Sequence, residues 1–575
     1  MSLTRRNDIL SHLFFESEAY KKFEDIEKLV ESGVSLSAIP IQPLFVSLQQ
    51  AMPDQVAQIL PRLSSEQRQA LRDMDFWTKD QLEPKVMNYW LEVYSKCPDE
   101  ETILEYLQSE DFLLTIKSQF NVMTFDVEDP MYPDHDRYFL TEDNLLLIEY
   151  DEEFTLVQEL KEHIRRLYGE LGVENAYAFL FKMVVDSFSI MEEENYRLKT
   201  ERLRDYGFVD YFEALAYQSL FTSEAEILDS LHKLNPQTPT LDDETLNQSL
   251  HATSLLPYQS GLGQMRDYLA KLENEKRLQY LQFDFIKLVN AQMTLEGALK
   301  DGSVAMNRVG LKTRYQLELG FDYIVKDLAD HEVLSLLEKL SFKDLYKIGH
   351  SLIEIHRKKL KKTIAASSFD KDEFSYFLGM YWNALIENSF EDIPKYKFDG
   401  STKAQEIHSY EIFKHWKKSL QTLMESLPYV EKFFTTLTKL KESSQLNDQF
   451  YLNYEVDNID FEAIILSSLI NFALVDSKEP TSGKMGMTVN ELKNFYHLYF
   501  NKVGEEYLVK GLEDLILAKK LHLFCESFGL DKISNFEQYL YQILVEQLNG
   551  YEIDQMSIDD FKHVGGPILL NTTEH

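Results

Sequence analysis

Most of the chain places its apolar residues at intervals of three and four, the spacing that puts them on one face of an α-helix. Phe23, Ile26 and Val30 follow this pattern near the start of the chain. The longest such segments are Met265–Leu299 and Phe413–Leu440, which we expect to form long amphipathic helices. The pattern therefore predicts a mostly α fold with several subdomains.

Short helices broken by proline are expected toward the N-terminus. The segments Ile41–Leu60 and Ser64–Met74 have helical spacing and are interrupted by Pro53 and Pro61. A further helix is expected over 84–94, because a proline suits the first turn of a helix. Helices of this length at nearly even intervals indicate stacked helical hairpins, as in repeat proteins, although no strict repeat period is present.

A different pattern occupies residues 112–150, which are rich in β-forming side chains. The segments Arg137–Leu140 and Leu145–Tyr150 flank the turn-forming residues Thr141–Asn144, an arrangement typical of a β-hairpin. We expect a small β-insert here, forming the only substantial sheet of the protein. Helices are expected to resume at about Leu156.

These patterns divide the chain into five regions. We expect an N-terminal helical-hairpin region over 1–110, a β-insert with helices over 111–234, a linker over 235–263, a central helical domain over 264–476 and a C-terminal helical region over 477–575. The linker is rich in residues that break regular structure, namely Pro236, Pro239, Pro257, Gly261 and Gly263.

The charge of the chain restricts its partners. The sequence has 96 acidic and 59 basic residues and a net charge of −37. Such a field repels phosphate backbones and anionic membrane surfaces, so we expect no nucleic acid and no membrane insertion. A protein partner is favoured, and a basic partner would suit the field. The acidity alternatively serves only to keep a large protein dissolved.

Cysteine content and hydropathy indicate the cytoplasm. With only Cys97 and Cys525, no disulfide framework holds the fold, which suits a reducing compartment. The longest uncharged apolar run, Ala463–Val475, is shorter than the roughly 20 residues that cross a bilayer. The first residues lack the apolar core of a signal peptide. The sequence does not indicate the oligomeric state.

The densest charge pattern lies within Glu192–Tyr217. Opposite charges stand one helical turn apart, as in Glu193–Arg197 and Arg197–Glu201. Gly207 follows as the expected end of this helix, in a conformation with positive φ. Two interpretations stay open: a solvent-exposed helix face bearing ion pairs, or a cluster in which an arginine grips a carboxylate or phosphate ligand.

Metal binding is not expected. One loop gathers several oxygen donors and an imidazole, but without the spacing of a calcium loop. These residues are Asp126, Glu128, Asp129, Asp134, His135 and Asp136. On a later helix His350 and Glu354 stand one turn apart, with no third ligand in the pattern, so a half-buried structural histidine is the alternative.

The only dense basic run is Arg357–Lys362. It either complements the C-terminal end of its helix or meets an anionic ligand or an acidic partner. Motifs for nucleophilic catalysis, dinucleotide binding and phosphate binding are missing from the sequence. We therefore expect no cofactor and assign no catalytic residue.

Several blocks resemble a bacterial family of unknown function, number 6178. They are Pro61–Pro84 (PRLSSEQRQALRDMDFWTKDQLEP), Arg202–Phe208 with the following Tyr211 and Glu213-Ala214, and Gly349–Leu352 (GHSL). The resemblance spans about residues 39–440 and implies no activity.

Two functions follow from these observations. The first is a cytoplasmic helical scaffold or regulatory binding protein, because stacked helices offer extended surfaces and catalytic motifs are missing. The alternative is an enzyme or ligand sensor with a pocket of arginine, carboxylate and histidine groups. Its candidate residues are Glu194, Arg202, Asp205, Glu213 and His350.

Overall fold

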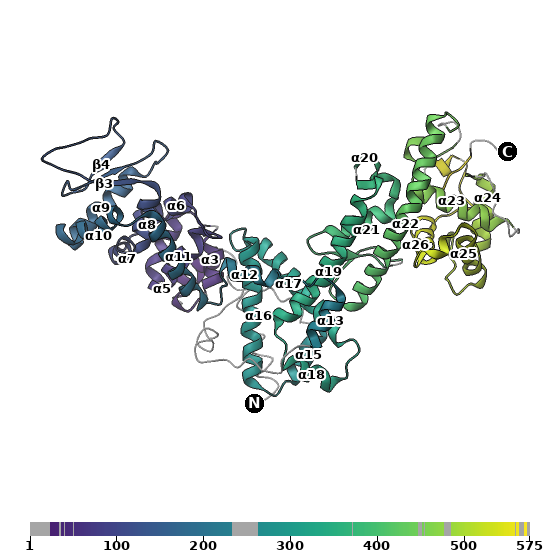
Figure 1. The fold of residues 1–575 in the computed structure, drawn as a ribbon, viewed down its shortest axis with the longest axis horizontal. Helices are drawn as coiled ribbons and strands as arrows, with labels where there is room; N and C mark the ends of the chain where they lie inside the picture. Colours follow the sequence, from purple (N-terminus) through teal and green to yellow (C-terminus); the bar gives the residue numbers. More distant parts are fainter. Residues whose placement is uncertain are drawn as a thin grey trace. The chain divides into compact units, whose positions relative to one another are not determined.

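The structure is a computed structural model that describes residues 23–571, except 34–35, 40, 50, 233–262, 371, 399, 447–450, 454, 476–484, 558 and 563–567. The described residues form a mostly helical fold with small antiparallel sheets, which confirms the predicted fold class (Figure 1). Apart from Gly263, the predicted linker over 235–263 lies outside the described residues.

The chain divides into two compact units. The first comprises residues 1–219, 230–314 and 327–347, and the second comprises 220–229, 315–326 and 348–575. Helices α17 (Ser303–Val325) and α19 (Phe342–Ala365) each contribute residues to both units. The finer division into five regions stays a prediction.

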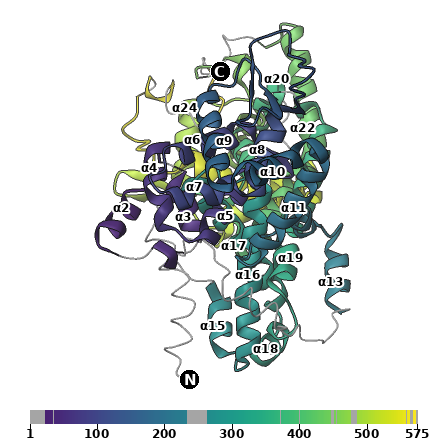
Figure 2. The same ribbon diagram turned by 90° about the vertical axis from the view of Figure 1, so that its left-hand side faces the viewer.

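The first unit is built mainly from short helices (Figure 1). They are α2 (Phe23–Glu31), α3 (Ile41–Leu48), α4 (Pro53–Ile59), α5 (Ser65–Asp75), α6 (Pro84–Ser95), α7 (Glu100–Leu107), α8 (Glu110–Gln119), α9 (Val157–Leu171), α10 (Val173–Val185), α11 (Phe188–Arg204), α12 (Tyr211–Leu215), α15 (Gly263–Lys271), α16 (Glu275–Glu296) and α18 (Asp330–Leu337). The proline-broken helices are confirmed, and Pro84 opens α6 as expected. Figure 2 shows α15 and α18 packed side by side.

One predicted helix is two helices. The segment Met265–Leu299 forms α15 and α16, separated at residues 272–274. The side chain of Asn274 accepts a hydrogen bond from the backbone N–H of Arg277 at 3.2 Å and so caps the start of α16. The amphipathic spacing continues through the break, and a capping residue decides the boundary.

The β-insert is confirmed in part. Strands β3 (Asn121–Thr124), β4 (Tyr138–Leu140) and β5 (Leu146–Glu149) form an antiparallel sheet in the order β3-β5-β4. Residues 112–119, which were expected to be β-structure, belong instead to helix α8. Ser109 caps this helix, and its apolar side chains are buried by helix packing, which overrides their β propensity. The other sheets among the described residues have two strands.

Two ion pairs hold α5 against its neighbours. Arg72 donates to Asp111 of α8 at 2.7 Å, and Asp73 receives two hydrogen bonds of 2.7 Å from the guanidinium of Arg202 on α11. Arg72 also donates to the hydroxyl of Tyr94 at 2.6 Å. Consecutive residues on a helix point about 100° apart. The two charges can therefore hold α8 and α11 at different faces of α5.

Helix α11 ends as the sequence predicts. Gly207 has a φ of 78°, and its N–H donates to the carbonyl of Arg204 at 2.9 Å. The following Phe208 N–H reaches back to Leu203 at 3.2 Å, which completes a left-handed helix end. The amide of Asn290 on α16 then donates to the Gly207 carbonyl at 2.9 Å. This contact fixes the turn against α16.

The second unit contains the longest described helix, α22 (Tyr410–Glu442). Its other helices are most of α13 (Glu224–His232), the later parts of α17 and α19, α20 (Asp372–Ser375), α21 (Met380–Phe390), α23 (Phe461–Leu474), α24 (Val489–Tyr499), α25 (Leu515–Phe528) and α26 (Phe536–Leu548). The predicted helix over 413–440 lies inside α22, which packs beside α23 and α26 (Figure 1).

Two-stranded hairpins complete the described sheets. The first unit has β1 (Trp77–Thr78) with β2 (Gln81–Leu82). The second unit has β6 (Lys395–Tyr396) with β7 (Gln405–Glu406), and β8 (Phe500–Val503) with β9 (Glu506–Val509).

Helices α17 and α19 approach closely within the second unit at Gly349. A Cβ atom added at Gly349 would lie 1.8 Å from the carbonyl oxygen of Gln316 and 2.9 Å from the backbone nitrogen of Gly320. Backbone atoms cannot move aside as a flexible side chain can. The glycine of the GHSL block is therefore explained by helix packing.

We expect Gly349→Ala to lower the free energy of unfolding of the second unit by about 3 kcal/mol, because the two helices must separate to admit the methyl group. The same change at Gly169, an exposed position of α9 with nothing within 4 Å of its added Cβ, should raise stability by about 0.5–1 kcal/mol. Denaturant unfolding of both variants measures this. Equal stability of Gly349→Ala and the unchanged protein would contradict the packing argument.

Candidate ligand-binding site

The first unit contains an open pocket of about 520 Å³. Its wall combines the end of α5, the β1–β2 hairpin, α11, the turn before α12 and the end of α16 with the residues that follow. Six side chains that line it define what we call the lysine pocket: Trp77, Lys79, Lys199, Asp210, Tyr211 and Lys300. Its volume is in the range of pockets that bind small organic ligands.

Lys199 is a half-buried lysine of this pocket whose ammonium lies over two aromatic rings. Its Nζ lies 5.2 Å from the ring centre of Trp77 and 4.6 Å from that of Tyr196. Within the described residues, this ammonium has no hydrogen bond and no carboxylate within 4 Å. Burial lowers the pKa of Lys199 to about 8, and the charge of Asp210 opposes this effect. The faces of the two rings also favour the charged form.

Lys300 differs from Lys199 although it lines the same pocket. Its Nζ donates to the backbone carbonyl of Asp75 at 2.7 Å and to the hydroxyl of Thr78 at 3.1 Å. Burial lowers the pKa of Lys300 as well. Its hydrogen bonds nevertheless join the segment after α16 to the β1–β2 hairpin. Lys300 is therefore part of the pocket wall.

Lys79 stands in an unusual backbone conformation. It occupies the tight turn between β1 and β2 with a φ of 60°, a region that non-glycine residues seldom adopt. The Lys79 Nζ lies 5.5 Å from the ring centre of Tyr211. Backbone strain of this kind is often found at functional sites. Here the turn carries a second cation to the pocket.

Three of the four carboxylates that line the pocket have partners, and the fourth, Asp301, is exposed. Asp73 is held by Arg202, as described above. Asp210 accepts a hydrogen bond from the hydroxyl of Tyr196 and another from the N–H of Phe212 at 3.0 Å. Glu296 pairs with Lys312 at 2.8 Å and also with Arg308 at 3.2 Å. Asp73, Asp210 and Glu296 are thus engaged by groups other than Lys199.

The five residues predicted from the sequence do not form this pocket. Glu194 and Asp205 are exposed on and after α11, and Glu213 pairs with Lys287 at 3.3 Å. His350 belongs to the second unit, whereas the other four belong to the first. Arg202 does grip a carboxylate, as one interpretation expected, but that carboxylate is Asp73 of the same chain.

The charged segment over 192–217 nevertheless contributes to the wall of the lysine pocket. It carries Lys199 and Asp210, which line the pocket, and Arg202 stands one turn from Lys199 on the same helix. The pair Arg197–Glu201, at 2.9 Å, is more than half exposed and fits the solvent-face interpretation. One helix therefore presents a solvent face and a pocket face.

Helix α19 also carries a second histidine, His356, and the basic run Arg357–Lys362. His356 and Arg357 make contacts within the second unit. His356 Nε2 lies 3.0 Å from Glu224, which also pairs with Lys417. Arg357 donates to the carbonyl of Ser389 at 2.7 Å and to that of Glu391. The lysines that follow Arg357 are exposed.

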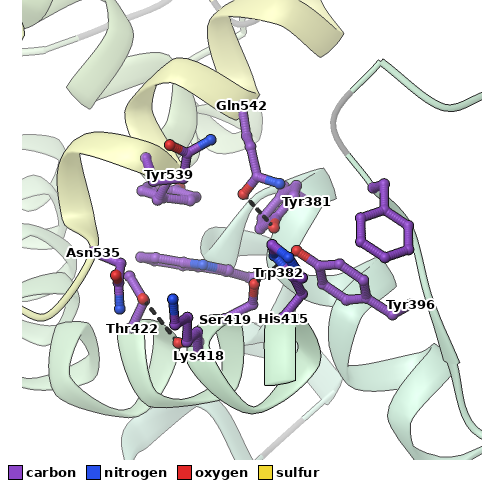
Figure 3. A pocket seen from close by; sticks show the side chains of 12 residues that line it. Tyr381, Trp382, Tyr396, His415, Lys418, Ser419, Thr422, Asn535, Tyr539 and Gln542 are labelled. Atoms are coloured by element: carbon purple, nitrogen blue, oxygen red, sulfur yellow. Dashed lines mark hydrogen bonds between the residues drawn. The ribbon is translucent and has the colours of Figure 1, made fainter. Parts of the chain in front are cut away.

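The second unit has its own pocket of about 370 Å³ (Figure 3). Six rings define this aromatic pocket: Tyr381, Trp382, Tyr396, Phe398, His415 and Tyr539. The fully buried Trp382 stacks on Tyr539 with 4.3 Å between ring centres, and the Tyr381 hydroxyl donates to Gln542 at 2.7 Å. Much of the surface of the Trp382 and Tyr539 rings is therefore covered by packing against each other and is not exposed to a ligand.

One hydroxyl of the aromatic pocket has no hydrogen-bond partner within the described residues, namely that of the buried Tyr539. It feels the charges of Glu462 and Asp460. Burial raises the pKa of Glu462 to about 8, and Asp460 adds to this effect. An unpaired hydroxyl costs much less than an unpaired ammonium. The lysine pocket is therefore the stronger candidate for a ligand.

Neither a metal-ligand cluster nor a membrane-spanning helix occurs among the described residues. The described residues contain no group of three or more His, Cys, Asp or Glu side chains placed to hold a metal ion. In the acidic loop, Asp126 accepts from the N–H of Glu128 at 2.9 Å, and His135 pairs with Glu149 at 2.7 Å. Every described helix is too short or too polar to span a bilayer.

Comparison with known proteins gives one match. A family model described as "Family of unknown function (DUF6178)" matches residues 16–521. The searches of curated proteins and of solved structures find no match.

The buried Lys199 should make stability depend on pH. Its pKa of about 8 in the folded protein lies below the value of about 10.4 in an unfolded chain. Between these values the unfolded state binds more protons, so the free energy of unfolding should rise with pH. Below pH 8 the charged Lys199 should cost up to about 3 kcal/mol, less the contribution of the two rings.

Lys199→Met should therefore raise the thermal midpoint at pH 7 and reduce the rise in stability between pH 7 and 9.5. The matched control is Lys85→Met, at an exposed lysine of α6 in the same unit. Thermal unfolding of the three proteins across this pH range measures both effects. A Lys199→Met protein that is less stable than the unchanged protein at pH 7 would contradict the burial argument.

Proposed function

Because the chain belongs to the family of unknown function DUF6178, which assigns no activity, we propose its function from the geometry: the first unit binds a small organic anion in the lysine pocket. The observation that carries the proposal is the ammonium of Lys199, which faces the pocket without an acceptor among the described residues. A carboxylate or phosphate group on a ligand would supply that acceptor.

The flat side chains of the pocket indicate the rest of the ligand. Trp77 lines the wall at the hairpin, and Tyr211 lines it at the start of α12. Aromatic side chains bind flat apolar groups through their faces and edges. A ligand with one anionic group and one flat apolar part therefore suits the lysine pocket best.

The acidity of the whole chain does not prevent anion binding. The net charge is −37, but salt screens exposed charges beyond about 8 Å at physiological ionic strength. Within the pocket, Asp73 and Glu296 are neutralised by their basic partners. The Lys199 and Lys79 ammonium groups then act on the ligand at short range. The local charge supports binding even though the overall field slows the encounter.

This proposal develops the expectation of a regulatory binding protein and places the ligand site on residues other than those first predicted. A scaffold function, a protein partner, the absence of nucleic acid and a cytoplasmic location remain predictions of the sequence. The lysine pocket supports a proposal about ligand binding and gives no support to the other predictions.

Benzoate and benzamide test the proposal, because they have nearly the same shape and differ in charge. A charge-assisted hydrogen bond contributes about 1.5–3 kcal/mol, so benzoate should bind at least about tenfold more tightly than benzamide. Lys199→Met should remove this difference, and Lys85→Met should retain it. Calorimetric titration at pH 7 measures the affinities. Equal affinity of the unchanged protein for both compounds would refute the proposal.

The benzoate affinity should also fall as pH rises. At pH 9 about one tenth of Lys199 keeps its proton, so binding should be roughly tenfold weaker than at pH 7. The charged and titratable groups around Lys199 are Asp73, Asp80, Tyr196, Asp210, Lys79 and Lys300. Titration across pH 7–9 with Lys199→Met as the control separates the contribution of Lys199 from those groups. An affinity independent of pH would contradict the role of Lys199.

Lys79→Gly should separate stability from binding. Glycine adopts a φ of 60° without strain, so the variant should be more stable by about 0.5–1 kcal/mol. Loss of the ammonium should at the same time weaken benzoate binding. Thermal unfolding and calorimetry on the same preparation measure the two effects. A variant with lower stability and unchanged affinity would contradict the placement of Lys79.

A further inference from the structure

The amine of Lys199 has a second property besides its charge. Within the described residues its Nζ donates no hydrogen bond, and it lies against the faces of Trp77 and Tyr196. When the amine loses its proton, its lone pair is therefore not engaged by a neighbouring donor. A buried amine of this kind is the form in which lysine acts as a nucleophile toward carbonyl compounds.

We infer that Lys199 forms a reversible imine with a small aldehyde or keto compound that carries an anionic group, held in the lysine pocket. The inference rests on the proposed function, since it concerns the same pocket, and it narrows the ligand class. The anionic group of such a ligand has a partner at Lys79, which lines the pocket from the β1–β2 turn.

The reaction balances without a further reagent. The neutral amine attacks the carbonyl carbon, the C–N bond forms and the carbonyl oxygen takes up a proton. The resulting carbinolamine then loses its hydroxyl as water, and a C=N bond forms. The ammonium and the carbonyl compound thereby become a protonated imine and one water molecule. One positive charge stands on each side, and no oxidant or reductant takes part.

Tyr196 and Asp210 make one side of the surroundings of Lys199 polar. The Tyr196 ring lies below the amine, and its hydroxyl donates to Asp210, a residue of the pocket wall. Burial and the Asp210 carboxylate raise the pKa of Tyr196, so this hydroxyl holds its proton near neutral pH. Asp210 already accepts two hydrogen bonds and lies beyond 4 Å of the amine, so water in the open pocket takes the proton that leaves the nitrogen. The hydrogen-bonded Tyr196 and Asp210 form the polar side of the space beside the reacting amine.

The other lysines of the pocket are less suited. The Lys300 amine is engaged in hydrogen bonds to Asp75 and Thr78, which stabilise its protonated form. Lys79 is exposed in its turn. With its pKa of about 8, half of Lys199 is neutral at pH 8, compared with less than about 1% of a lysine with ordinary pKa. The reaction should therefore select Lys199.

The test uses the full chain, 4-formylbenzoate as the probe and cyanoborohydride to reduce the imine to a stable amine at pH 8. Digestion and mass spectrometry then locate the adduct. We expect labelling of Lys199 at least about tenfold above that of Lys85, because of the difference in neutral amine. Benzoate should slow the labelling of Lys199 by occupying the pocket, and benzamide should have little effect.

Lys199→Arg is the matched variant, because it keeps the positive charge and removes the nucleophile. It should retain preference for benzoate over benzamide and lose the adduct at position 199, with labelling elsewhere unchanged. If this variant does not fold, the imine inference is tested on the unchanged protein by comparing how benzoate and benzamide slow the labelling of Lys199. Labelling of Lys199 at the rate of Lys85, or labelling that benzoate does not slow, overturns the imine inference. If benzoate binds more tightly than benzamide but Lys199 is not labelled selectively, the proposed function stands and the imine inference fails. If Lys199 is labelled selectively but benzoate binds no more tightly than benzamide, only the proposed function fails.

Discussion

The first unit depends on two adjacent charges of α5. Arg72 is almost fully buried and binds Asp111 of α8, while Asp73 receives both hydrogen bonds of the Arg202 guanidinium on α11. Removing one partner from a buried ion pair commonly costs about 3–5 kcal/mol, because the other charge is left without compensation. The first pair therefore holds α8 on α5 and the second holds α11 on α5, and each depends on both of its partners. Arg202 stands one turn from Lys199, so the same contact positions the amine in the pocket.

The sequence predicted the elements whose signals are local. Gly207 ends its helix with positive φ because the residues on either side form a recognisable helix end and restart. The hairpin around Thr141–Asn144 was predicted from its turn residues in the same way. Residues 112–119 were assigned to β-structure because their side chains favour strands. Tertiary packing and the Ser109 cap make them helical, and neither effect is visible in a short window of sequence.

Four of the five residues proposed from the sequence lie in the segment 192–217, which also contributes to the lysine pocket, but the two sets contain different residues. Arginines and carboxylates suggested a ligand cluster, and Arg202 indeed binds a carboxylate, yet that carboxylate is Asp73, far away in the sequence. Lys199 gave no signal of its own, because its burial and its contact with Trp77 arise only when α5 and α11 pack together. The GHSL block shows the converse case. Its glycine has a packing explanation that needs the Gln316 carbonyl on another helix.

A buried amine without an acceptor lowers the stability of the fold that holds it. Most polar groups in protein interiors are hydrogen bonded, since an unpaired one is costly and an unpaired charge more so. Around Lys199 the structure meets this rule at Asp73, Asp210 and Lys300, whereas the half-buried Lys199 has only the faces of Trp77 and Tyr196 beside its ammonium. Lys199 and Arg202 lie one turn apart on α11. The ion pair between Arg202 and Asp73 therefore stabilises the same part of the helix that the half-buried charge of Lys199 destabilises. An apolar side chain at position 199 would avoid the cost of a half-buried charge, and this cost is the physical basis of the proposed anionic ligand.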